Sequence, residues 1–185
     1  MLLSKKYINI YTQYLQSLQI TQILKYFINN DSILVDATAG MGGDSNNFCK
    51  NFKFVYCLEE NYECIKYLEY NLQYFENKEI FNINCIEGLK LINYNAVYFD
   101  PPWGGNNYKY KNNLDLFLYY NNKQINILDF INSLYFYSEF IFIKIPINFN
   151  NDKLNQLLWK YIIFPIYKFT NNFNKISFNL IVFYK

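Results

Sequence analysis

The sequence predicts an α/β fold: a doubly wound, mostly parallel seven-stranded sheet with helices on both faces and a C-terminal antiparallel hairpin. Two observations support this. Short apolar runs alternate with amphipathic segments, which is typical of βαβ units. Several of these runs end directly in a carboxylate, as strands often do at the ligand-binding edge of such sheets. With 185 residues there is room for a single domain, and we expect residues 1–30 to form a helical cover over a core of residues 31–185.

The first half of the chain is expected to alternate between helix and strand. Apolar residues spaced along one helical face predict a helix over Leu18–Ile28, which Asp31 ends. Uninterrupted apolar runs, expected of strands buried on both faces, follow at intervals. We expect strands at Ile33–Val35, Phe54–Leu58, Phe81–Ile86 and Ala96–Phe99, with helices near Asp44–Lys50 and along Ile65–Phe75 between them.

The second half is expected to complete the sheet. Its apolar runs are again short, and a proline after one of them marks a strand end. In chain order we expect a helix at Ile125–Tyr137, a fifth strand at Phe140–Ile145 stopped by Pro146, a helix at Asp152–Lys160, and a hairpin of Tyr161–Phe169 with Lys175–Tyr184.

The composition limits which partners and cofactors the protein can have. The net charge is only +2, so the chain lacks the electrostatic footprint of proteins that bind long duplexes, and a small or terminal piece of nucleic acid fits better. The four cysteines form no CxxC pair and histidine is absent, so we expect reduced thiols and no metal site. No apolar stretch approaches the roughly 20 residues that cross a bilayer. We therefore expect an intracellular protein without membrane association, and a monomer.

Four acids directly follow the four strands predicted in the first half: Asp36, Glu59, Glu87 and Asp100. Ligands of open parallel sheets bind at the carboxyl ends of the strands, so these acids are expected to converge on one crevice. An ordinary solvated strand end is the alternative for each acid taken alone. For Glu87 a surface turn is nearly as good an explanation.

A glycine-bearing turn follows Asp36 and predicts a cofactor site. Ser45 stands where a dinucleotide-binding loop has its third glycine. An acid before the loop suits the ammonium of an amino acid, as in S-adenosyl-L-methionine, better than a pyrophosphate. Glu59, about 20 residues further on, suits ribose hydroxyls, and Glu87 an adenine amine. The predicted cofactor-binding residues are Asp36, Ala37, Gly40, Gly42, Gly43, Glu59 and Glu87.

The string Asp100-Pro101-Pro102-Trp103-Gly104-Gly105 predicts the reaction centre. Two prolines after a buried strand fix a rigid extended turn, and they hold Trp103 beside the strand end. An exocyclic amine on a base is a poor nucleophile, because its lone pair is delocalised into the ring. Hydrogen bonds from that amine to the Asp100 carboxylate and the Pro101 carbonyl would orient the lone pair, while Trp103 stacks on the base. Asp100, Pro101 and Trp103 are therefore the predicted catalytic residues.

With these motifs in place, the chain resembles the class I methyltransferases that act on amino groups, which have a Rossmann-like fold. It is most similar to the trimethylguanosine synthases, which methylate the guanine N2 of a 7-methylguanosine RNA cap. The similar stretches are Val35–Ala37 with Gly40–Gly43, Pro101–Gly105 followed by Tyr108, and Pro146 with Asn148. The resemblance implies S-adenosyl-L-methionine as cofactor and an m7G-capped RNA or cap dinucleotide as partner. It also matches Thr21 to a family threonine near the methionine carboxylate.

The resemblance implies that Trp103 stacks on the methylated guanine and that Tyr108 lies near it, and Asn148 is a further predicted substrate-binding residue. Two positions depart from the family. Asp100 stands where cellular synthases typically have serine, and Ile147 stands where they have an arginine that helps hold the cap phosphates. Arginine is absent from the chain, so phosphate binding would fall to Lys109, Lys111 or Lys144.

Two alternatives remain open at this point. Asp100 would equally suit an N6-adenine or a ribosomal guanine-N2 methyltransferase. A catalytically silent subunit that keeps the fold is a different class, but it would have no need to retain both the cofactor motif and the Asp100 motif. The small size and AT-rich codon bias suggest a virus, cytoplasmic element or parasite, with a cytoplasmic location if viral or plasmid-encoded and a nuclear one if cellular.

Overall fold

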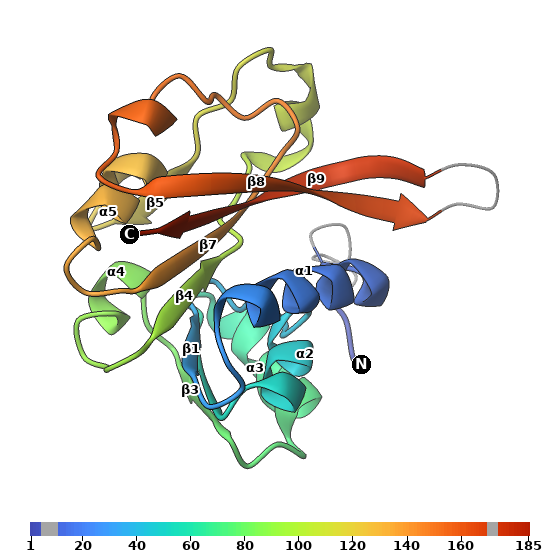
Figure 1. Ribbon diagram of the computed structural model, residues 1–185. Coiled ribbons are helices and arrows are strands. Elements are labelled where there is room, and N and C mark those ends of the chain that lie inside the picture. The colour runs from blue at the N-terminus through green and yellow to red at the C-terminus, as the bar shows by residue number, and fades with distance from the viewer. Residues whose placement is uncertain (5–10, 170–173) are drawn as a thin grey trace. The chain divides into compact units, whose positions relative to one another are not determined.

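The computed structural model describes residues 1–4, 11–169 and 174–185. In this part of the chain the main sheet has seven strands, in the order β3-β2-β1-β4-β7-β9-β8 (Figure 1). These strands are β1 (Ile33–Asp36), β2 (Phe54–Leu58), β3 (Lys78–Phe81), β4 (Ala96–Phe99), β7 (Phe140–Ile145), β8 (Lys160–Phe169) and β9 (Asn174–Tyr184). The predicted fold class, an α/β sheet with a C-terminal antiparallel hairpin, is confirmed.

Residues 1–98 form the first of two compact units. Its three strand pairs, β1 with β2, β1 with β4 and β2 with β3, are all parallel. All four residues of β4 are buried, which explains why this strand is an uninterrupted apolar run in the sequence. The helices of this unit are α1 (Tyr14–Phe27), α2 (Ser45–Asn51), α3 (Tyr62–Leu72) and α4 (Cys85–Gly88).

Residues 99–185 form the second unit. Here β9 pairs antiparallel with both β7 and β8, so the predicted closing hairpin and the predicted strand Phe140–Ile145 are confirmed. The unit also contains a two-stranded sheet, β5 (Phe117–Tyr120) with β6 (Lys123–Asn126), and the helix α5 (Ile127–Ser133). Two short 3₁₀ helices, η2 (Gly105–Tyr110) and η3 (Leu154–Gln156), complete the described elements.

The predicted strand Phe81–Ile86 is wrong in position and length. β3 ends at Phe81, and α4 begins at Cys85 because the Asn84 side chain accepts a hydrogen bond from the Ile86 N–H and caps the helix. Glu87 therefore lies exposed in α4 and not at a strand end. The prediction that four successive strands end in an acid holds for three of them.

Two predicted helices of the second half are also wrong in extent. The segment expected to be helical from Ile125 instead begins in β6, because Asn121 and Asn122 adopt positive φ angles of 49° and 58° and turn β5 into β6. Asn126 then caps α5 through the Leu128 N–H, so the helix covers only its middle part.

The helix expected at Asp152–Lys160 is reduced to η3. Upstream of it the Asn150 side chain accepts from the Asp152 N–H, a local bond that competes with helix formation. Downstream, buried Trp159 donates its indole N–H to the Ile131 carbonyl at 3.1 Å, and Lys160 already belongs to β8. The first helix is longer than expected, since α1 begins at Tyr14.

Candidate active site

The loop after β1 is held between its two neighbouring strands. The Ala37 N–H donates to the Tyr98 carbonyl of β4 at 2.9 Å, and the Ala39 N–H donates to the Leu58 carbonyl of β2 at 3.0 Å. Asp36, at the end of β1, is 1% exposed and accepts a 2.5 Å hydrogen bond from the Ser45 hydroxyl at the start of α2. The acid before the loop thus fixes both ends of the turn.

The three loop glycines differ in what they do. Gly40 has φ +54° and open space where a side chain would begin, so its backbone is accessible to a ligand. Gly42 has φ +85°, and a Cβ there would lie 2.9 Å from Leu68 of α3, so it is required for packing. At Gly43 a Cβ would lie 2.9 Å from the Tyr11 ring. Gly40 is therefore the position most suited to binding.

Glu59 links the end of β2 to this loop. Its Oε2 accepts from the Gly40 N–H at 2.8 Å, and its Oε1 accepts from the Asn61 N–H at 2.7 Å. Burial raises the pKa of Glu59, and these two backbone hydrogen bonds only partly counteract it. A partly buried carboxylate at a strand end, beside an accessible glycine, is suited to accept hydrogen bonds from ligand hydroxyls.

The other two predicted cofactor residues lack such support. Thr21 is 2% exposed within α1, and its hydroxyl donates to the Ser17 carbonyl of the same helix at 2.8 Å. Glu87 lies exposed in α4, as described above. Their proposed roles stay predictions.

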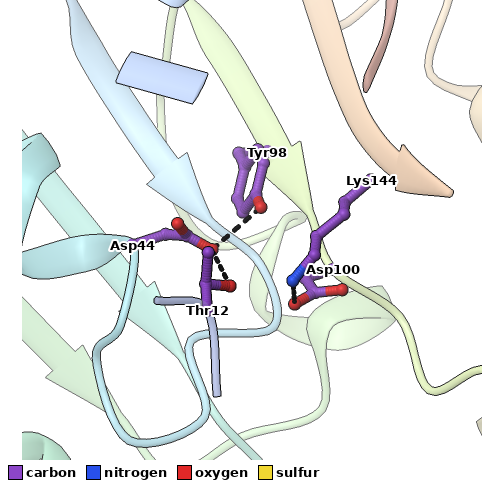
Figure 2. Close-up of polar contacts among 5 residues, drawn as sticks. All are labelled: Thr12, Asp44, Tyr98, Asp100 and Lys144. Atoms are coloured by element: carbon purple, nitrogen blue, oxygen red, sulfur yellow. Dashed lines mark hydrogen bonds and ion pairs between the residues drawn. The ribbon is translucent and has the colours of Figure 1, made fainter. Parts of the chain in front are cut away.

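Asp44, which sequence reasoning treated only as a helix start, proves to be a buried polar centre of the first unit. Figure 2 shows its Oδ2 accepting hydrogen bonds from the Thr12 hydroxyl at 2.8 Å and the Tyr98 hydroxyl at 2.9 Å. Asp44 is 5% exposed, and its buried Oδ1 has no hydrogen-bond partner within residues 1–4, 11–169 and 174–185. An acid directly after two glycines was the signal available in the sequence. Thr12, in the segment before α1, gave no signal of its own.

In the second unit, Asp100 follows β4 and forms an ion pair with Lys144 of β7. Figure 2 shows the two side chains, with Lys144 Nζ 2.7 Å from Asp100 Oδ2. The side chain of Lys144 is 6% exposed and that of Asp100 is 20% exposed. Lys144 was predicted as a phosphate ligand, but the structure places it against the proposed catalytic carboxylate.

Trp103 lies in an aromatic cluster with the same lysine. Its ring makes edge contacts with Tyr108, at 5.1 Å between centroids, and with Phe178 of β9, at 6.2 Å. Lys144 Nζ lies 5.6 Å from the Trp103 centroid and 4.6 Å from that of Phe178. The Trp103 indole N–H is buried and has no hydrogen-bond partner among the described residues, so it could donate to a ligand. Phe178 was not identified from the sequence, because it lies in the distant hairpin.

The remaining predicted substrate residues surround η2. The Asn148 amide donates to the carbonyls of Tyr108 at 2.8 Å and Lys111 at 2.6 Å, so it holds this segment in place. Lys109 is exposed, with Nζ 5.8 Å from the Tyr108 ring centroid, and Lys111 is exposed as well. These two lysines are more accessible to phosphates than Lys144.

Two kinds of feature are absent from the described residues. No group of three or more cysteine, aspartate or glutamate side chains there is arranged to hold a metal ion. No helix in the same residues has both the length and the apolar character needed to span a membrane.

Comparison with known proteins identifies relatives. Over 92 aligned residues, the chain is 36% identical to the uncharacterized protein L320 of Acanthamoeba polyphaga mimivirus. The alignment covers 45% of this chain and 35% of that protein, so the chain spans about a third of the length of this relative.

Solved structures share the fold at low sequence identity. An rRNA methylase from Streptococcus thermophilus is 15% identical, with a TM-score of 0.57 over 90% of this chain and 94% of that one. A putative RNA methyltransferase from Pyrococcus horikoshii is 14% identical, with a TM-score of 0.59 over 91% of this chain and 83% of that one. These likenesses show a Rossmann-like class I methyltransferase fold.

A sequence profile of one family matches residues 31–184, which is most of the chain. That family is described as RNA cap guanine-N2 methyltransferase. The matched range contains the loop after β1, Glu59 and the Asp100–Trp103 turn. The chain therefore belongs to the RNA cap guanine-N2 methyltransferase family.

Proposed function

We propose that this protein transfers a methyl group from S-adenosyl-L-methionine to the exocyclic N2 amine of a 7-methylguanosine RNA cap. The observation that carries the proposal is the Asp100–Trp103 turn, in which a fixed carboxylate and an indole lie in one cluster with Lys144. A carboxylate that orients an amine and an aromatic ring that stacks on its base are the two groups this reaction needs. Membership in the cap guanine-N2 family supports the choice of base.

The loop after β1 fits the proposed cofactor. The open space at Gly40 admits a ligand to the backbone, and Glu59 offers a carboxylate beside it. Asp36 and Ala37 belong to the same loop, whose backbone is fixed by β2 and β4. S-adenosyl-L-methionine supplies an electrophilic methyl group on a positively charged sulfur. In this proposal residues 1–185 act as one methyltransferase domain, with residues 1–30 as a cover.

Within the proposed reaction, Asp100 and the Pro101 carbonyl accept hydrogen bonds from the amine and turn its lone pair toward the methyl group. The amine nitrogen forms a bond to the methyl carbon as the carbon–sulfur bond breaks, and one amine proton then leaves to solvent. Trp103 stacks on the base and fixes its plane, and Tyr108 supports Trp103 by its edge contact. Lys109 and Lys111, both exposed, would bind the cap phosphates.

Asp100 suits an adenine N6 amine or a ribosomal guanine N2 amine as well, so the substrate must be tested against these. The assay follows transfer of labelled methyl from the cofactor to an m7G cap, an unmethylated cap, adenine-containing DNA and ribosomal RNA. We expect the m7G cap to be the preferred acceptor. Transfer confined to DNA or ribosomal RNA would replace the cap assignment with one of the two alternatives, and no transfer to any acceptor would contradict the activity itself.

A further inference from the structure

Lys144 is an unusual residue for a buried strand. Five of the six residues of β7 are buried and Lys144 is one of them, yet it carries a charge. A buried ammonium requires a partner, and here the partner is the Asp100 carboxylate at 2.7 Å. The positive charge of Lys144 therefore lies against Asp100, the residue that is proposed to face the reacting amine.

The ion pair changes the electrostatics of the proposed base site. An isolated Asp100 carboxylate would attract a cationic base such as 7-methylguanine more strongly than a neutral guanine. With Lys144 at 2.7 Å, the pair has no net charge, so its attraction for a cationic base is weaker than that of an isolated carboxylate. Lys144 also lies within cation–π distance of Trp103, so the ring on which the base would stack already interacts with one cation.

We infer that Lys144 is a positioning and specificity-determining residue, which sets how strongly the site discriminates between cationic and neutral guanine by neutralising Asp100. The inference rests on the proposed function, since it assumes that the base binds at Trp103. It makes Asp100 and Lys144 a unit: the site with both charges and the site with neither should discriminate alike. Sites with only one of the two charges should differ in opposite directions.

The test measures the affinity of four proteins for m7GTP and GTP by calorimetry at about pH 6.5, well above the ordinary aspartate pKa of about 3.9. The proteins are wild type, Asp100→Ser, Lys144→Met and the double variant. Relative to wild type, the preference for m7GTP should rise roughly tenfold in Lys144→Met and fall roughly tenfold in Asp100→Ser, the effect of one charge several ångströms from the base. In the double variant it should return to within about threefold of wild type.

Two controls separate charge from structure. Lys144→Arg keeps the positive charge and should keep the wild-type preference, whereas a purely steric role would not survive this change. Lys160→Met removes an exposed lysine of β8 in the same unit and should also leave the preference unchanged. Both measurements use ligand binding, so they do not depend on residual turnover.

Lys144→Met is the variant at risk of misfolding, because it leaves a carboxylate without its ion-pair partner. Asp100→Ser and the double variant can then be compared, because they differ only in the lysine charge and neither has the Asp100 carboxylate. The double variant should prefer m7GTP roughly tenfold more than Asp100→Ser does. If wild type binds m7GTP and all variants show the same preference for m7GTP over GTP, the inference is wrong but the proposed function stands. A wild-type protein that binds neither nucleotide overturns the proposed function and the inference with it.

Discussion

Replacing Glu59 by glutamine should weaken cofactor binding without a matching loss of stability. Glu59 accepts two backbone hydrogen bonds, from Gly40 at 2.8 Å and Asn61 at 2.7 Å. Glutamine retains one acceptor oxygen but places an NH₂ group against the other backbone N–H. Losing that hydrogen bond to a charged group costs about 1.5–3 kcal/mol. The same change removes a charge whose burial is unfavourable, as the raised pKa of Glu59 indicates.

These two effects oppose each other, so the free energy of unfolding should change by less than about 1 kcal/mol at neutral pH. The raised pKa also fixes the sign of the pH dependence. The stability contributed by protonated Glu59 is fully present below its ordinary pKa of 4.5 and is lost as the pH rises through the higher pKa of the folded protein. Glu59→Gln should therefore flatten the stability curve over this acidic range.

Cofactor affinity, in contrast, should fall by about 1–3 kcal/mol, because the ribose hydroxyls lose a charged acceptor. Calorimetry with S-adenosyl-L-methionine measures the affinity, and urea unfolding with and without ligand measures stability. Glu60→Gln is the matched control, since it removes the same charge from the adjacent exposed residue. Equal cofactor affinities for wild type and Glu59→Gln would remove Glu59 from the site.

Three further substitutions test the rest of the site. Asp100→Ala should lower the turnover number far more than it weakens cofactor binding; single-turnover rates within about threefold of wild type, roughly 0.65 kcal/mol, would refute its role. Trp103→Ala should abolish methyl transfer, whereas Trp103→Phe should keep part of it and lose part of the about 0.5–2 kcal/mol by which indole favours a cationic base. If the m7GpppA to GpppA ratio of kcat/KM is the same in Trp103→Phe as in wild type, stacking on Trp103 is not the source of discrimination. Asp44→Ala should destabilise the protein by about 2–4 kcal/mol in urea unfolding, because the buried Thr12 and Tyr98 hydroxyls lose their shared acceptor, and Asp44→Asn, which keeps an acceptor oxygen, should cost less. Equal midpoints for the alanine variant and wild type would show that the buried network contributes nothing.

The strands that could be predicted from sequence are those whose buried residues form a short apolar run. β1, β2, β4 and β7 are apolar runs, and their predicted bounds agree with the structure to within one residue. β3 is an edge strand with no fully buried residue, so nothing in its pattern marks where it ends. The Asn121-Asn122 pair is typical of a turn, but it is one of several asparagine pairs in the chain, so it did not by itself predict the hairpin of β5 and β6.

In the candidate site, too, local features could be predicted and contacts between distant residues could not. Acids at strand ends and glycines in the first loop were predictable, because they depend on local order along the chain. Partners that are distant in sequence were not: Asp100 and Lys144 are 44 residues apart, and Asp44 and Tyr98 are 54 apart. The lysine within the apolar strand Phe140–Ile145 was assigned to cap phosphates, whereas its burial in β7 requires a partner that the fold was needed to identify.

The most direct test of the account is to locate the methyl group that the protein adds to m7GpppA. The dinucleotide is incubated with the protein and S-adenosyl-L-methionine, and the product is cleaved to nucleosides and analysed by mass spectrometry. The added methyl should lie on the guanine N2 amine, and Asp100→Ala should form little of this product. A methyl group on the adenine, or no product from folded protein that binds the cofactor, would contradict it.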